Sequence, residues 1–142
     1  MTQLQPVQVY FDDLDAMGML HNSRYALLVE RAVSAFWTDL GWRFDPAQSA
    51  FKDVFLAVRE FKIVYNAPVL GAGEVLVEFW LERMGRTSGV YGFRVLSADG
   101  SVVHAEGHRV NVNLDPATFR PAPFSDEIRA AAAVLLREPA AL

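Results

Sequence analysis

The chain contains no cysteine, which excludes disulfides, thiolate-bound metals and a cysteine nucleophile. Lysine is scarce as well, with only Lys52 and Lys62. No apolar run approaches the length of a membrane-spanning helix, and the first residues lack a basic and then apolar signal pattern. The net charge of −4 argues against broad binding to nucleic acid. We therefore expect a cytoplasmic protein with neither membrane nor nucleic-acid partners.

The length and the apolar content indicate one folded unit. A chain of 142 residues with 52% hydrophobic residues can bury a sizeable core, so we expect a single domain over residues 1–142. Neither a Gly-x-Ser-x-Gly elbow nor a phosphate-binding loop is present. These absences remove the serine-hydrolase and nucleotide-binding classes that such motifs would indicate.

The spacing of apolar residues predicts a short strand, one long helix and then four strands. The first strand alternates apolar and polar residues around Val9, and Asn22 or Ser23 then caps a helix that runs to about Leu40 and is ended by Gly41. A long apolar helix against antiparallel strands is an α+β arrangement, and open strand edges imply self-association. The later strands are expected at 55–65, 73–83, 87–96 and 101–114, and a short alanine-rich helix is expected after 125.

An acidic turn between the first strand and the helix is the strongest candidate for chemistry. A carboxylate beside helix N-terminal amides can act on a carbonyl that those amides polarise. On residue types alone, however, Asp13 and Asp15 are more often turn formers and caps. The spacing Asp13-x-Asp15-x-x-Gly18 also resembles an EF-hand loop, but Met17 and Arg24 stand where calcium ligands are required. We therefore expect no metal site here or elsewhere.

The same turn carries a resemblance to a known family. The stretch Asp13-Leu-Asp15-Ala-Met-Gly18-Met-Leu-His-Asn22-Ser-Arg-Tyr25, followed by Glu30-Arg-Ala, resembles the signature of the 4-hydroxybenzoyl-CoA thioesterase-like hotdog family. The resemblance covers nearly the whole chain, since the later strands fall in the expected order. It implies the hotdog fold, in which a curved antiparallel sheet wraps a long central helix. It also implies hydrolysis of an acyl- or aryl-CoA thioester to the free acid and coenzyme A.

The resemblance assigns roles to residues of the turn and the helix start. Asp15 falls at the position of the catalytic carboxylate, which would act as a nucleophile or as a general base on water. The backbone N–H around Asn22 would polarise the thioester carbonyl. Gly18 and Tyr25 are expected at the substrate, although a tyrosine there is more often part of the core. Glu30 matches the family's helical glutamate, and we expect it to be structural or at an interface.

A hairpin later in the chain is the candidate for binding the coenzyme A phosphates. Arginine and hydroxyl groups fit phosphate oxygens well, although on residue types alone the hairpin is at least as often a solvated turn. The expected site lies between two subunits, with Asp15 from one and strand residues from the other. We expect a homo-oligomer, a tetramer built from dimers. The hairpin residues concerned are Arg83, Arg86, Thr87 and Ser88.

Two other functions are compatible with a hotdog fold. A non-catalytic acyl-CoA-binding protein is the main alternative, and the retention of Asp15 argues against it. A hydratase would require a catalytic histidine with an acidic partner, and no such pair is visible. No metal or redox cofactor is implied, because coenzyme A is part of the substrate.

Overall fold

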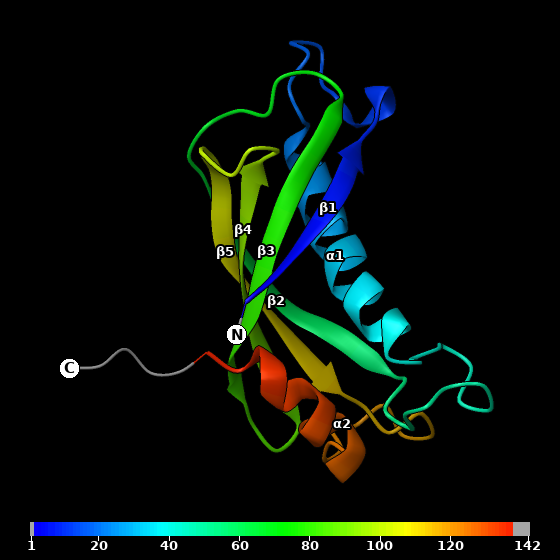
Figure 1. Ribbon diagram of the computed structural model, residues 1–142. Helices are drawn as coiled ribbons and strands as arrows, with labels where there is room; N and C mark the ends of the chain where they lie inside the picture. Colours follow the sequence, from blue (N-terminus) through cyan, green and yellow to red (C-terminus); the bar gives the residue numbers. More distant parts are fainter. Residues whose placement is uncertain (1, 138–142) are drawn as a thin grey trace.

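The computed structural model describes residues 2–137, which form an antiparallel sheet and one long helix (Figure 1). The five strands are arranged in the order β1-β3-β4-β5-β2. This architecture confirms the predicted α+β class. The strands are β1 (Gln3–Val9), β2 (Leu56–Tyr65), β3 (Gly73–Met84), β4 (Ser88–Ser97) and β5 (Val103–Asn113), the helices are α1 (Tyr25–Asp39) and α2 (Asp126–Ala132), and the short 3-10 turns are η1 (Phe11–Asp13), η2 (Asn22–Arg24) and η3 (Ala133–Leu135).

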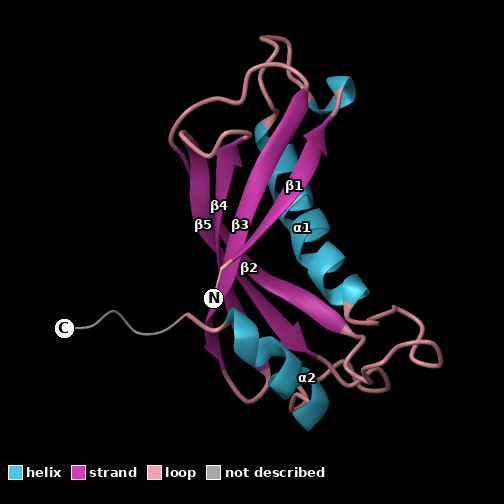
Figure 2. Ribbon diagram, viewed as in Figure 1, coloured by secondary structure: helices cyan, strands magenta, loops and turns pink. Residues whose placement is uncertain are grey.

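The helix α1 lies along one side of the sheet and packs one face into the core (Figure 2). Leu28, Val29 and Ala32 follow helical spacing and are fully buried. They pack into the same cluster as Phe79 of β3 and Phe93 of β4, which are also buried. This packing fixes the direction of α1, so its N-terminus is held beside the turn that follows β1.

The start of the long helix differs from the prediction. Residues 22–24 form the 3-10 turn η2, and α1 itself begins at Tyr25. The cap acceptor is the ring Nδ1 of His21, which accepts from the Ser23 N–H at 3.1 Å, so the predicted cap at Asn22 or Ser23 is wrong. An imidazole nitrogen without its proton can accept as a hydroxyl does. The predicted end is confirmed, since Gly41 has a φ of 98°.

The edge strand β2 is irregular. Its register against β5 shifts between Val58 and Glu60, which breaks the strict alternation predicted for this strand. As a result Val58 faces the α1 side together with Phe61 and Ile63, whereas strict alternation would separate them. Because β2 is last in the sheet order, no strand pairs with its outer edge within residues 2–137.

A buried carboxylate fastens α2 to the sheet. Asp53 is 4% exposed and accepts from the backbone N–H of Ser125 at 2.8 Å and from its hydroxyl. It also accepts from the amide of Asn113 at 3.3 Å. Ser125 in turn caps α2 by accepting from the Ile128 N–H. The N-terminus of α2 is therefore held through one side chain.

The variant Asp53→Ala is expected to lower the free energy of unfolding by about 3 kcal/mol, because it leaves the buried N–H and hydroxyl donors of Ser125 without their acceptor. Urea denaturation of the variant and the wild type measures the difference. The exposed Asp39→Ala is the matched control and should change stability by less than about 0.5 kcal/mol. Equal effects of the two substitutions on the free energy of unfolding would show that the hydrogen bonds of Asp53 do not stabilise the fold.

Candidate active site

The carboxylate of Asp15 is held in a fixed orientation by its own turn. Its Oδ1 accepts from the backbone N–H groups of Met17 at 2.8 Å and Met19 at 3.1 Å. Its backbone N–H donates to the Met19 carbonyl at 2.7 Å. The second oxygen, Oδ2, accepts no hydrogen bond from any residue between 2 and 137. One oxygen thus positions the group and the other is free to act on a ligand.

Two further residues hold the turn. Gly18 donates to the Asp15 carbonyl at 3.0 Å and accepts from Gly71 at 2.9 Å, with a φ of 75° that favours glycine. It does not line the pocket at Asp15. Asp13 is 4% exposed, and its carboxylate accepts from the Tyr10 N–H at 2.8 Å. Its role is therefore structural, as expected.

Asp15 opens on a pocket at the start of α1, which we call the acidic-turn pocket. The backbone N–H of Asn22 has no acceptor within the described chain, and the Asn22 carbonyl accepts from the Tyr65 hydroxyl at 3.3 Å. Tyr65 packs edge-on against Tyr25, with ring centroids 5.0 Å apart. Burial raises the pKa of the Tyr25 phenol, and the neighbouring Tyr65 raises it further. The pocket is lined by Asp15, Met19, Leu20, Asn22, Tyr25, Tyr65, Asn66, Ala67 and Pro68.

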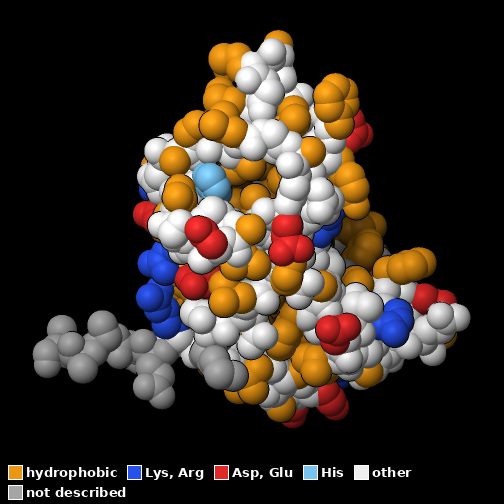
Figure 3. Space-filling model, turned by 45° about the horizontal axis from the view of Figure 1, so that its top comes forward, with side chains coloured by type: hydrophobic (Ala, Val, Ile, Leu, Met, Phe, Trp, Pro, Cys, Tyr) orange, Lys and Arg blue, Asp and Glu red, His pale blue; other side chains and the backbone are white. Residues whose placement is uncertain are grey.

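Apolar side chains surround this end of the molecule. Phe11, Met17 and Leu70 are 86%, 74% and 73% exposed. Figure 3, which turns this end forward, shows such side chains gathered on its surface. Exposed apolar groups beside a pocket are typical of a surface that meets an apolar ligand or another protein.

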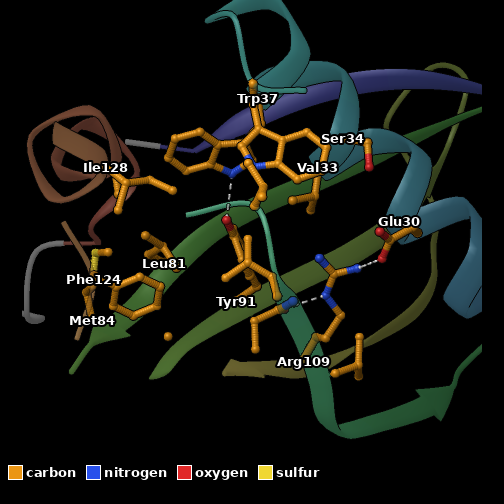
Figure 4. Close-up of a pocket in the computed structure, with 17 residues that line it drawn as sticks. Glu30, Val33, Ser34, Trp37, Leu81, Met84, Tyr91, Arg109, Phe124 and Ile128 are labelled. Atoms are coloured by element: carbon orange, nitrogen blue, oxygen red, sulfur yellow. Dashed lines mark hydrogen bonds and ion pairs between the residues drawn. The ribbon is translucent and has the colours of Figure 1, made fainter. Parts of the chain in front are cut away.

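A second cavity, the apolar pocket, lies between the far half of α1, the sheet and α2 (Figure 4). Its volume is about 150 Å³. Trp37, Leu81 and Phe124 give it apolar walls, and Leu56 and Val58 bring in the edge strand β2. In Figure 1 the acidic turn is at the upper end of α1 and α2 is near its lower end, so the two pockets are far apart within one chain.

A polar network crosses the apolar pocket. Tyr91 of β4 and Arg109 of β5 are register partners, and both are buried. Trp37 donates from Nε1 to the Tyr91 hydroxyl at 2.8 Å. Arg109 donates from Nε to Asn111 Oδ1 at 2.9 Å and forms an ion pair with Glu30. The sequence pattern missed Tyr91, Arg109 and Asn111, although the last two occupy inward-facing positions of a strand, where polar residues are informative.

The buried phenol of Tyr91 makes folding sensitive to alkaline pH. Burial raises its pKa to about 12, against the smaller lowering effects of the Trp37 hydrogen bond and the Arg109 charge. Because the phenol of the unfolded chain has a pKa of about 10, this stabilisation is full below that pH and is lost as the pH rises towards 12. The free energy of unfolding should fall by roughly 2–3 kcal/mol over that window. Urea denaturation of wild type and Tyr91→Phe measures it: parallel pH curves would contradict the prediction.

The structure brings some of the sequence candidates together and separates others. Asp15, Asn22 and Tyr25 line one pocket, and the tyrosine that completes it, Tyr65, was missed. The hairpin that carries the expected phosphate-binding residues lies at the opposite end of the molecule from this pocket, beside α2. There Arg129 of α2 donates to the Gly85 carbonyl at 2.6 Å. In this hairpin Arg83 and Arg86 are exposed, and Thr87 and Ser88 are half-buried.

Comparison with known proteins decides the family. The model of the thioesterase-like superfamily matches residues 9–132. The chain belongs to this superfamily. Membership confirms the resemblance to hotdog thioesterases and the prediction of a thioester hydrolase.

The chain is also similar to individual proteins of known sequence or structure. The acyl-CoA thioester hydrolase YbgC of Escherichia coli O6:H1 is 26% identical to the chain, over 82% of the chain and 84% of that protein. The PA2801 protein from Pseudomonas aeruginosa superposes with a TM-score of 0.77 at 29% identity, covering 90% of this chain and 95% of that one. The Synechocystis protein Slr0204, a 1,4-dihydroxy-2-naphthoyl-CoA thioesterase, superposes with a TM-score of 0.80, covering 95% of this chain and 98% of that one. Because it is only 15% identical to the chain, this likeness shows the fold alone.

Within residues 2–137 no three histidine, aspartate or glutamate side chains gather as a metal site would require. In that part of the chain no helix is both long and apolar enough to span a bilayer.

Proposed function

We propose that the protein, as a single domain over residues 1–142, hydrolyses acyl-CoA or aryl-CoA thioesters with Asp15 as the catalytic carboxylate. One observation carries the proposal: Asp15 and Asn22 line the same pocket, and within residues 2–137 neither Oδ2 of Asp15 nor the backbone N–H of Asn22 has a hydrogen-bond partner. The thioester carbonyl oxygen accepts from the Asn22 N–H, which stabilises the negative charge that develops there. The carboxylate acts on the carbonyl carbon from the other side.

Two routes are open to the Asp15 carboxylate. As a nucleophile it forms an anhydride with the acyl group and expels the thiolate, and water then cleaves the anhydride. As a general base it takes a proton from water, whose oxygen attacks the carbonyl carbon. In both routes the C–S bond breaks, the sulfur leaves as the thiol of coenzyme A, and the acyl group gains the oxygen of water.

The proposal places each site between two copies of the chain. In one copy the span from Asn22 to Glu30 covers about 12 Å of helix axis, and the apolar pocket continues to Trp37. The edge strand β2 joins the two regions, since Leu56 lines the apolar pocket and Tyr65 the acidic-turn pocket. Antiparallel pairing of β2 with a second β2 about a two-fold axis puts the Tyr65 end of one copy beside the Leu56 end of the other.

This arrangement unites the groups that one chain keeps apart. The apolar pocket of the partner would lie beside Asp15 and receive the acyl group. The hairpin with Arg83 and Arg86, at the same end as the apolar pocket, would reach the phosphates of coenzyme A. A tetramer built from such dimers and a cytoplasmic location belong to the same proposal.

Release of free thiol from a panel of acyl-CoA and aryl-CoA thioesters tests the reaction. A thiol-reactive chromophore reports coenzyme A directly, and hydration of an unsaturated acyl group would release none. The expected result is enzyme-dependent release from at least one class of thioester. Tight binding of acyl-CoA without thiol release from any of them would favour the non-catalytic alternative.

A further inference from the structure

The apolar pocket contains buried hydrogen-bond donors that the protein itself leaves unused. Tyr91 is 7% exposed, and its hydroxyl accepts from Trp37, but its own proton has no acceptor within residues 2–137. Arg109 is 4% exposed and uses Nε and one terminal nitrogen, while its other terminal nitrogen donates to none of the described residues. Figure 4 shows both side chains rising from the sheet towards Trp37 and Glu30 of α1. Both residues line the cavity, so both groups can donate to a ligand atom there, and a ligand that displaces water without accepting from them would leave them unfavourably unpaired.

The charge balance of the pocket selects the kind of acceptor. Glu30 pairs with Arg109 and keeps half of its side chain, 51%, in solvent. The guanidinium is therefore already neutralised, and a ligand carboxylate would add an uncompensated negative charge beside Glu30 in an apolar cavity. A neutral oxygen, such as that of a hydroxyl, carbonyl or ether group, satisfies the donors without that penalty.

We propose that the Tyr91–Arg109 pair recognises a neutral oxygen in the acyl part of the substrate, which makes the preferred substrates oxygenated acyl-CoA or aryl-CoA thioesters. This inference rests on the proposed function, because the pocket receives the acyl group of a thioester held by Asp15 of the other copy. The walls formed by Trp37, Leu81 and Phe124 bind the apolar body of that group. Plain acyl groups fit the walls but leave both donors unpaired, so they should be selected against.

Matched pairs of thioesters test the inference. We would measure the dissociation constants of octanoyl-CoA and omega-hydroxyoctanoyl-CoA, and of phenylacetyl-CoA and para-hydroxyphenylacetyl-CoA, by calorimetry on the Asp15→Asn protein, which is not expected to consume them. The hydroxylated member of at least one pair should bind about tenfold or more tightly. Tyr91→Phe, made in the same background, should reduce that ratio to within about twofold. Tyr10→Phe removes an exposed hydroxyl outside both pockets and should keep the ratio unchanged.

The outcomes separate this inference from the proposed function. Equal binding within both pairs, or a preference that survives Tyr91→Phe, overturns the inference even if the wild type hydrolyses thioesters. A preference that Tyr91→Phe removes supports it even if the wild type releases no thiol, in which case only the proposed hydrolysis fails. Circular dichroism and a melting curve of Tyr91→Phe establish that a lost preference reflects the hydroxyl and not unfolding. If that variant does not fold, Arg109→Lys, which keeps the charge but replaces the guanidinium by a single ammonium nitrogen and so removes the free donor, tests the other member of the pair and should likewise reduce the ratio.

Discussion

Replacing Asp15 by asparagine is expected to lower kcat/KM for thioester hydrolysis by a hundredfold or more, about 2.7 kcal/mol of transition-state stabilisation. The amide oxygen of asparagine can still accept from Met17 and Met19, so the turn keeps its shape. The group that replaces Oδ2 can neither attack a carbonyl carbon nor take a proton from water. Initial rates of thiol release, measured at several substrate concentrations, give the ratio directly.

The neighbouring Asp12→Asn is the matched control for this prediction. Asp12 is exposed and does not line the acidic-turn pocket. Its substitution by asparagine removes the same charge from the same turn. It should leave kcat/KM within about threefold of the wild type. If Asp15→Asn were no more damaging than Asp12→Asn, Asp15 would be a structural residue and another group would perform the hydrolysis.

Gly107→Ala is expected to lower the free energy of unfolding by about 3 kcal/mol or more. Gly107 of β5 is the register partner of Ile63, and a Cβ atom there would lie 1.8 Å from the Lys62 carbonyl oxygen. Backbone atoms cannot yield as a flexible side chain does, so β2 must move away from β5. Chemical denaturation measures the loss, and size-exclusion chromatography should show a smaller particle, because β2 is the edge proposed to pair with a second copy.

Gly89→Ala is the control for this steric argument. Gly89 lies in β4 of the same sheet, where an added Cβ would meet its nearest atoms at 3.7 and 3.8 Å, ordinary contact distances. We expect its effect on stability to be below about 1 kcal/mol. A Gly107→Ala protein as stable as Gly89→Ala would mean that β2 is not held against β5 as the structure has it.

The sequence was sufficient to predict the elements because their patterns are local. The helical spacing around Leu28 and the alternation along β3 each follow from one period, and Gly41 marks a helix end by its backbone preference. The bulge in β2 was not predictable, since one unpaired residue moves Val58 to the α1 side without changing the composition of the strand. The His21 cap was missed for a similar reason, because histidine is rarely chosen over a neighbouring asparagine or serine.

The candidate site was predictable only where its residues are close in sequence. Asp15 and Asn22 belong to one motif, so a resemblance could assign them before the structure placed them in one pocket. Tyr65 joins them from β2, and Tyr91 meets Arg109 only through the β4–β5 register. Contacts of this kind depend on the tertiary arrangement, which cannot be predicted from the local patterns of a single sequence.

A mixed oligomer tests most directly whether Asp15 of one copy works with the apolar pocket of another. Asp15→Asn removes the carboxylate, and Met84→Trp fills the apolar pocket from the end of β3, away from the β2 edge. Each variant alone should hydrolyse thioesters poorly. If sites are shared, a dimer purified with one differently tagged copy of each variant contains one site with both changes and one with neither. It should then recover about half of the wild-type rate of thiol release. A mixed dimer no more active than its two parents would contradict the shared site.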